Sequence, residues 1–152
     1  YAGIRPAVNV GLSVSRVGGD AQTKAMKQVA GRLRLDMASF RELAAFAQFG
    51  SDLDKSTQAQ LNRGLHLQEV LKQPQYEPMS LENQVIEIFA ATRGFADQVA
   101  LDRMRAWEIS LLRYMETSYP EIGRAIAAEK RISPETEKKL VDAIQAFSAT
   151  WQ

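Results

Sequence analysis

The chain has 152 residues, of which 45% are apolar and 24% are charged, and its formal net charge is +1. This length suffices for one domain with a buried core, and the composition is typical of soluble globular proteins rather than disordered ones. There is no cysteine and His66 is the only histidine, which excludes disulfides, thiolate catalysis and histidine metal clusters. No apolar run reaches the roughly 18 residues of a membrane-spanning helix, so we expect no direct membrane insertion.

Residues 8–17 have the pattern of a β-strand. Val8, Val10 and Val14 alternate with small or polar residues, and β-branched side chains at a period of two favour an extended backbone. A lone strand leaves both edges unpaired, so it must join a sheet supplied by upstream residues or by a neighbouring chain. Because the chain begins with Tyr1 rather than Met, we expect it to be a fragment that lacks its upstream portion.

From Asp20 onward the spacing of apolar residues is helical, and Asp20 is the expected N-cap. Gly31 marks a possible junction in this region. Asp52 or Asp54 is expected to cap the next helix, which Pro74 stops. The first stripe comprises Ala25, Met26, Val29, Leu33, Leu35, Met37, Phe40, Leu43, Phe46 and Phe49.

The second half predicts further helices. Ser80 is the expected N-cap of a helix that Gly94 interrupts, and another helix is expected from about residue 101 to 117. Pro120 opens a short successor, and Ser133 with Pro134 begins the last helix. The predicted fold is mainly α, with a helical bundle over residues 20–152 after a short β-strand stub within residues 1–19.

Recognisable catalytic motifs are absent: the sequence has no phosphate-binding loop, nucleophile elbow or zinc-protease helix. Asp52 and Asp54 could serve acid-base or metal chemistry, but helix capping is the favoured interpretation. Phe40, Phe46 and Phe49 could form a docking surface, although core packing is favoured for most of them. His66 is expected to lie on the surface.

One alternative function rests on charge. Residues 1–35 contain six basic residues against Asp20 alone: Arg5, Arg16, Lys24, Lys27, Arg32 and Arg34. A stand-alone helical interaction module that binds nucleic acid through its first helix would use the stretch from Lys24 to Arg34. No aromatic residues are interleaved there, so a solvated or partner-facing surface is favoured and no nucleic acid is expected.

Four segments of the sequence resemble the alpha-subunit family of the rotary F-type ATP synthases. They read GIRPAVNVGLSVSRVGG at 3–19, AQTKAMK at 21–27, FRELAAFAQFGSDLD at 40–54 and LKQPQY at 71–76. The resemblance spans nearly the whole chain, and the acidic loop of the related beta subunits is not found. It implies that residues 1–19 end a nucleotide-binding domain and that residues 20–152 form the family's C-terminal helical domain. The phosphate-binding loop would then lie upstream of Tyr1.

The resemblance also implies site residues. Arg16 matches an arginine finger that acts in trans on the catalytic site of a neighbouring beta subunit, and Ser15 is expected at the same interface. Arg5, Pro6, Gln73 and Gln75 match the adenine pocket of the alpha subunit's own non-catalytic nucleotide site.

The family further implies ATP or ADP with Mg²⁺ in the full complex, with no metal ligands in this chain and no cofactor held by it alone. The implied partners are beta subunits, the gamma central stalk and other subunits of the complex. The segment from Glu42 to Asp54 is expected to face the stalk and to expose Phe46 or Phe49. The implied location is the periphery of an energy-coupling membrane, at the cytoplasmic face of a bacterial inner membrane or its organelle equivalent. The isolated chain is expected to be catalytically inactive.

Overall fold

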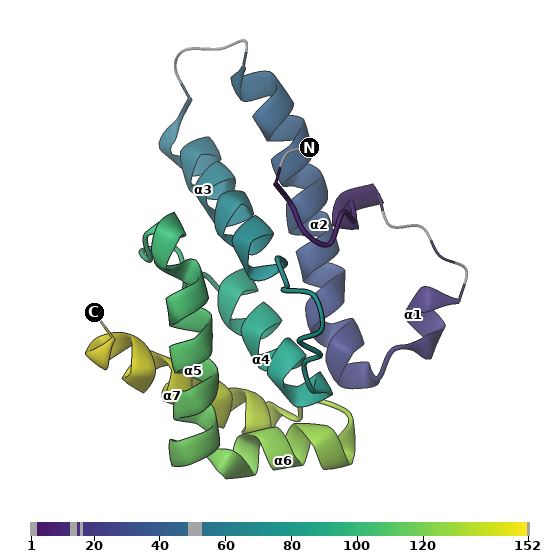
Figure 1. The fold of residues 1–152 in the computed structure, drawn as a ribbon, viewed down its shortest axis with the longest axis vertical. Coiled ribbons are helices and arrows are strands. Elements are labelled where there is room, and N and C mark those ends of the chain that lie inside the picture. Colours follow the sequence, from purple (N-terminus) through teal and green to yellow (C-terminus); the bar gives the residue numbers. More distant parts are fainter. Residues whose placement is uncertain (1–2, 13–14, 16, 49–52, 152) are drawn as a thin grey trace.

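The computed structural model describes residues 3–12, 15, 17–48 and 53–151, and these residues are helical or irregular throughout (Figure 1). The long helices α2 and α3 lie side by side, α4 lies below them, and α5 to α7 form the other end of the molecule. The elements in chain order are η1 (Val10–Leu12), α1 (Gly18–Ala21), α2 (Lys24–Ala47), α3 (Lys55–Val70), α4 (Leu81–Thr92), η2 (Leu101–Arg103), α5 (Met104–Ser118), α6 (Pro120–Glu129) and α7 (Pro134–Thr150).

The mainly helical fold is confirmed, but the strand is not seen in the described part of residues 8–17. Val10–Leu12 instead forms the short 3₁₀ helix η1, in which Asn9 caps the N–H of Leu12 with its side chain at 3.2 Å. The physical reason is the missing sheet: extended backbone needs neighbouring strands, and the described residues supply none. Val10 packs on the helical core instead.

The start of α2 differs from the prediction. Thr23 is the N-cap and its hydroxyl accepts the N–H of Met26 at 3.3 Å, while Asp20 lies within the short helix α1. The extended backbone of Gln22 and Thr23 separates the two helices, so the cap must follow that break. Gly31 causes no junction, because α2 continues through it.

The core is built around α4, which packs against α2, α3, α5 and α6. As expected, Ser80 caps this helix by accepting the N–H of Asn83. Most of the last two turns of α4 are buried, including Phe89 and Ala90. Among the described residues, no helix has the length and apolarity that a bilayer crossing requires.

The C-terminal half follows the predicted caps closely. Pro120 opens α6, and the Ser133 hydroxyl accepts the N–H of Thr136 at 3.1 Å, with Pro134 as the first residue of α7. Both signals are local, so they do not depend on distant packing. The rings of Trp107, Tyr114, Phe147 and Trp151 form a continuous aromatic cluster between α5 and α7.

His66 is buried, with 3% of its surface exposed, so the expectation that it lies on the surface is wrong. Its two ring nitrogens lie 2.7 Å from the carbonyl oxygen of Asn62 and 2.6 Å from that of Val99. The Asn62 side chain also donates to the carbonyl of Asp97 at 3.0 Å. These contacts hold the connection between α4 and α5 against α3, and a distant partner of this kind leaves no local sequence signal.

The aromatic residues of α2 divide by position. Phe40 is half-buried against Gly64 of α3, whereas Phe46 is 72% exposed near the end of the helix. Exposure of Phe46 agrees with the expectation that Phe46 or Phe49 is exposed in the segment from Glu42 to Asp54. Phe49 and Asp52 lie outside the described residues, and Asp54 is the N-cap residue of α3 and accepts a hydrogen bond from the Thr57 hydroxyl.

Substitution of two glycines tests the packing of α2 on α3: Gly64 lies at the contact, and Gly31 is an open position of α2. A Cβ atom at Gly64 would lie 2.2 Å from the Phe40 ring and 2.6 Å from its Cβ, which cannot move without its backbone. We expect Gly64→Ala to destabilise the chain by roughly 1–3 kcal/mol despite the better helix propensity of alanine. Gly31→Ala meets no atom within 4 Å and is expected to stabilise it by roughly 0.5–1 kcal/mol.

Urea unfolding of the two variants and the parent chain measures both effects. A gain of stability in Gly64→Ala would contradict the close approach of Phe40. A loss in Gly31→Ala would contradict an open position in α2.

Candidate functional site

Two predicted site segments that are far apart in the sequence meet at one hydrogen bond. The backbone N–H of Gln73 donates to the carbonyl of Arg5 at 2.9 Å, and the N–H of Val8 donates to the carbonyl of Pro6 at 2.8 Å. The N-terminal segment crosses α2 beside the loop that follows α3 (Figure 1). The side chains of Arg5, Pro6 and Gln73 are exposed, so this cluster is open to a ligand or a partner chain.

The loop between α3 and α4 carries the two predicted glutamines. It begins after Leu71, the C-cap of α3, and contains Tyr76 with φ of 65°. The Gln73 side chain donates to the carbonyl of Glu77 at 2.6 Å and so closes the turn around Tyr76. Gln75 lies within this turn and is exposed. The side-chain amides of Gln73 and Gln75 are thus exposed on a turn that the Gln73–Glu77 hydrogen bond closes.

Charged side chains connect this loop to the core. Arg105 of α5 pairs through Nη2 with Oε2 of Glu77 at 2.9 Å and through Nη1 with Oε2 of Glu108 at 3.2 Å. The Glu108 side chain is only 3% exposed. Arg105 therefore spans from a buried carboxylate to one on the loop surface.

Glu87 of α4 and Glu108 of α5 are both buried in the bundle. Burial, followed by the charge of Glu108, raises the pKa of Glu87 to about 8, although Arg105 lowers it. Burial also raises the pKa of Glu108 to about 7, against the hydrogen bond and charge of Arg105. Oε1 of each carboxyl is buried without a hydrogen-bond partner. The single guanidinium of Arg105 therefore lowers the raised pKa of both buried acids.

These acids were not predicted as special residues. Glu87 interrupts the apolar run from Val85 to Phe89, and Glu108 follows Trp107 at an i,i+3 spacing from Arg105. Two signals could have identified these acids. One is an acidic residue inside an apolar run, and the other is a basic residue one helical turn before an acidic one.

Of the two predicted catalytic positions, Arg16 lies outside the described residues. Ser15 is exposed, and its hydroxyl accepts the N–H of Gly18 at 2.8 Å, which makes it part of the turn before α1. The described residues thus bring Arg5, Pro6 and Gln73 together, with Gln75 on the same loop, while Ser15 belongs to another turn.

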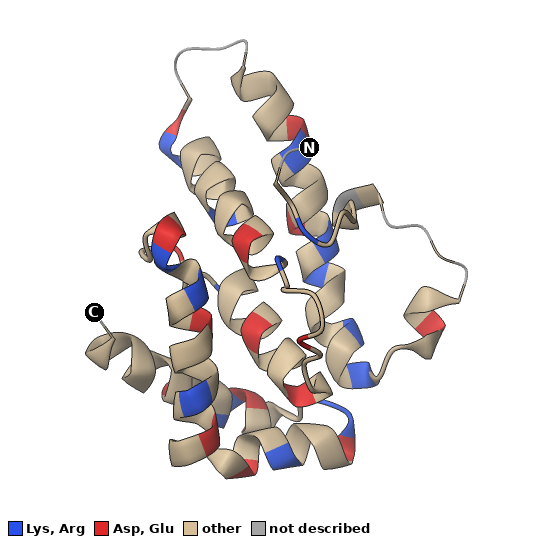
Figure 2. Cartoon of the chain, viewed as in Figure 1, with Lys and Arg blue, Asp and Glu red and all other residues tan. Residues whose placement is uncertain are grey.

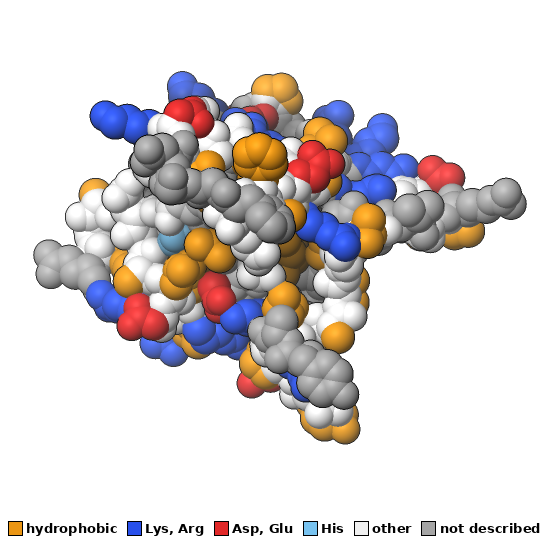
Figure 3. Space-filling view, turned by 90° about the horizontal axis from the view of Figure 1, so that it is seen from above, with side chains coloured by type: hydrophobic (Ala, Val, Ile, Leu, Met, Phe, Trp, Pro, Cys, Tyr) orange, Lys and Arg blue, Asp and Glu red, His pale blue; other side chains and the backbone are white. Residues whose placement is uncertain are grey.

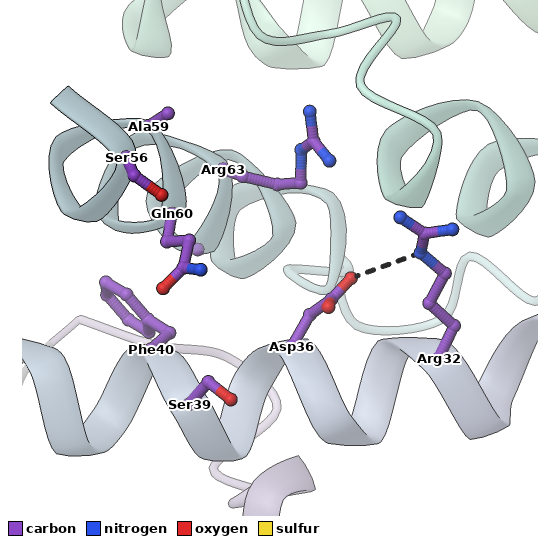
Figure 4. Close-up of a pocket in the computed structure, with 9 residues that line it drawn as sticks. Arg32, Asp36, Ser39, Phe40, Ser56, Ala59, Gln60 and Arg63 are labelled. Atoms are coloured by element: carbon purple, nitrogen blue, oxygen red, sulfur yellow. Dashed lines mark ion pairs between the residues drawn. The ribbon is translucent and has the colours of Figure 1, made fainter.

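A hollow of about 310 Å³ lies between α2 and α3, away from these residues (Figure 4). Arg32 and Asp36 face it from α2 and form an ion pair at 3.8 Å, and Phe40 points from α2 toward α3. None of the predicted site residues lines it; the lining comprises Arg32, Asp36, Ser39, Phe40, Ser56, Ala59, Gln60, Arg63 and Gly64.

The basic stretch of α2 is neutralised in part by acids. Lys27 pairs with Asp20 at 3.8 Å, and Arg32 pairs with Asp36. Acidic and basic residues are interspersed along the helices (Figure 2) and over the face seen from above (Figure 3). A surface of mixed sign does not favour binding to a nucleic acid backbone. Among the described residues, no group of three or more His, Asp or Glu side chains gathers as around a metal ion.

Comparison with known proteins decides the family. Residues 22–147 match the family described as the ATP synthase alpha/beta chain, C-terminal domain. The chain belongs to this family. The all-helical bundle and the helix-capping residues described above are thus those of an ATP synthase alpha/beta C-terminal domain.

Three curated relatives of this ATP synthase domain are named ATP synthase subunit alpha. The chain is 58% identical to that of Desulforudis audaxviator (strain MP104C) over 147 residues, which is 97% of this chain and 29% of the relative. It is 55% identical to that of Lawsonia intracellularis (strain PHE/MN1-00) and 57% to that of Desulfovibrio desulfuricans (strain ATCC 27774 / DSM 6949 / MB), each over 99% of this chain and 30% of the relative. The chain therefore spans about 30% of the length of these relatives.

The buried acids of this ATP synthase domain predict a pH-dependent stability. Between the ordinary carboxyl pKa of 4.5 and about 8, the unfolded chain releases the Glu87 proton while the folded chain keeps it. Stability therefore falls as pH rises through this window. Glu87→Gln removes this loss, so we expect it to raise the free energy of unfolding at pH 8 by on the order of 2–4 kcal/mol.

Urea unfolding at pH 5 and pH 8 checks this expectation. The gain should shrink toward pH 5, and Glu116→Gln, at an exposed position of α5, should change stability little at either pH. Equal gains for Glu87→Gln at both pH values would show that proton binding is not the cause.

Proposed function

We propose that the chain is the C-terminal part of the alpha subunit of a rotary F-type ATP synthase. The observation that carries this proposal is identity of 55–58% over 97–99% of the chain to proteins named ATP synthase subunit alpha. In this proposal residues 1–19 end the nucleotide-binding domain, and the helical bundle that follows forms contacts within the complex. Its partners are beta subunits and the central stalk, at the periphery of an energy-coupling membrane. The isolated chain has no catalytic activity.

The role proposed for Arg16 is that of an arginine finger acting in trans. Its guanidinium stays charged at all physiological pH values and offers several donors in a plane, which suits charge spread over a transferring phosphoryl group. The catalytic nucleotide and its Mg²⁺ would be held by the neighbouring beta subunit. Ser15 would lie at the same interface, and its hydroxyl accepts the N–H of Gly18.

The second proposed role is an adenine pocket formed by Arg5, Pro6, Gln73 and Gln75. The backbone hydrogen bond between Gln73 and Arg5 supports it, because it joins the two segments that the pocket requires. An adenine edge needs both donors and acceptors, which an exposed amide such as that of Gln75 offers, while a proline ring and a guanidinium give flat contact surfaces. These residues fit a purine base. The nucleotide phosphates would be bound by upstream residues.

The finger role is tested by Arg16→Ala in the full complex. We expect multisite ATP hydrolysis to fall roughly 10³-fold or more, because the developing phosphoryl charge loses its donor. Arg16→Lys keeps the charge without the planar group and should restore only part of the rate. Arg124→Ala, at an exposed position of α6, is the matched control and should retain the parental rate. Wild-type hydrolysis by Arg16→Ala would rule out the finger.

The pocket role is tested by Gln75→Ala in the full-length subunit. Loss of one or two amide hydrogen bonds should weaken binding of a fluorescent MgATP analogue at the non-catalytic site by roughly 3- to 10-fold. Gln145→Ala, an exposed glutamine on α7, should bind as tightly as the parent. Unchanged affinity in Gln75→Ala would remove this residue from the pocket.

A further inference from the structure

A continuous series of polar contacts runs from the buried face of α5 to the loop that carries Gln73 and Gln75. It passes from Glu108 to Arg105 at 3.2 Å, and from Arg105 to Glu77 at 2.9 Å. The Glu77 carbonyl then accepts the Gln73 side chain at 2.6 Å. Glu77 therefore contacts α5 through its carboxylate and the loop through its backbone.

The loop requires such a tie because its turn is strained. Tyr76 has φ of 65° and is 89% exposed, so no burial of its ring offsets the left-handed backbone. This conformation costs a non-glycine residue roughly 1–2 kcal/mol. The Gln73 side chain closes the turn from one side. Arg105 holds the Glu77 end from the other, so the two contacts together oppose relaxation of the turn.

The inner end of the series determines where Arg105 points. Glu108 is almost fully buried, and its position on α5 beside Trp107 is fixed by the core. A surface ion pair between two free side chains would be weak and mobile. Here one carboxylate is anchored, which restricts the guanidinium to directions from which its other nitrogen reaches Glu77. Two further ionisable groups of the described residues lie near this pair: Glu87 on α4, whose raised pKa keeps it largely protonated at neutral pH, and Glu69 on α3, which pairs with Lys72 at 2.6 Å.

We propose that Arg105 and Glu77 are positioning residues for the adenine-binding loop, which they hold in its binding conformation by linking it to α5. This inference rests on the proposed adenine pocket. Arg105 touches no nucleotide in it and acts through Glu77. The linkage lowers the ordering cost of nucleotide binding, because the amides of Gln73 and Gln75 are placed before the base arrives.

The experiment measures binding of a fluorescent MgATP analogue to the non-catalytic site of the full-length subunit. Glu77→Gln removes the negative charge but keeps the backbone carbonyl that accepts Gln73. We expect affinity to fall roughly three- to fivefold, the scale of a partly exposed ion pair. The thermal midpoint should stay within about 2 °C of the parent, since an exposed pair contributes little to global stability.

The control breaks a comparable ion pair away from the loop. Arg93, the C-cap residue of α4, and Glu137 of α7 are 42% and 39% exposed in their side chains, close to the 45% and 60% of Arg105 and Glu77. Glu137→Gln should leave nucleotide affinity unchanged. A loss equal to that of Glu77→Gln would attribute the effect to general loosening and would overturn the positioning role.

A double-mutant cycle separates positioning from a merely structural effect. If Arg105 acts through Glu77, the double variant Glu77→Gln with Arg105→Met should bind the analogue no more weakly than Arg105→Met alone. Arg105→Lys, which reaches one carboxylate at a time, should show an intermediate affinity. Fully additive losses, or parental affinity in Glu77→Gln, would overturn the inference.

Failure of the pocket and failure of the linkage give different results. If Gln75→Ala weakens binding while Glu77→Gln does not, the pocket stands and the positioning inference is wrong. If Gln75→Ala, Gln73→Ala and Glu77→Gln all bind with parental affinity, the proposed pocket itself is wrong and the inference falls with it.

Discussion

The burial of α4 is the constraint on which the rest of the bundle depends. This short helix contacts α2, α3, α5 and α6, and its residues from Val85 to Thr92 are nearly all removed from solvent. A helix with so little exposed surface must be covered on several sides by helices from both halves of the chain. The helices that cover α4 also fix where the loop before it and the connection after it begin and end. The α3–α4 loop is therefore suspended between two helices whose positions the core determines.

The same burial explains why the acids of α4 and α5 are unusual. Glu87 is buried in the apolar core, and Arg105, whose charge lowers the pKa of Glu87, already contacts Glu108 and Glu77. A carboxyl group in such a place keeps its proton to higher pH at a cost in stability. Residues that lower stability without packing benefit often serve another purpose. Here the cation that the buried pair attracts is also the group that reaches the exposed loop.

The parts of the fold that the sequence predicts well are those with local causes. Ser80, Ser133 with Pro134, and Pro120 each begin a helix through contacts or dihedral limits within one turn of chain, and the structure confirms all three. Two of the failures involve distant partners. The strand around Val10 lacked a sheet, and the surface location expected for His66 ignored a carbonyl at Val99, which approaches only after α3 and the α4–α5 connection pack together.

The candidate site shows the same division between local and distant causes. Spacing alone marks Gln73, Pro74 and Gln75 as a polar turn, and only resemblance to the ATP synthase family relates them to Arg5. The hydrogen bond from Gln73 to Arg5 then gives that relation a physical basis, because backbone groups this close cannot belong to independent segments. Arg105 could not be identified in either way, since its link to Glu77 arises from the packing of α5 beside α4. The conformation of the α3–α4 loop can therefore depend on α5, a helix that carries none of the proposed site residues.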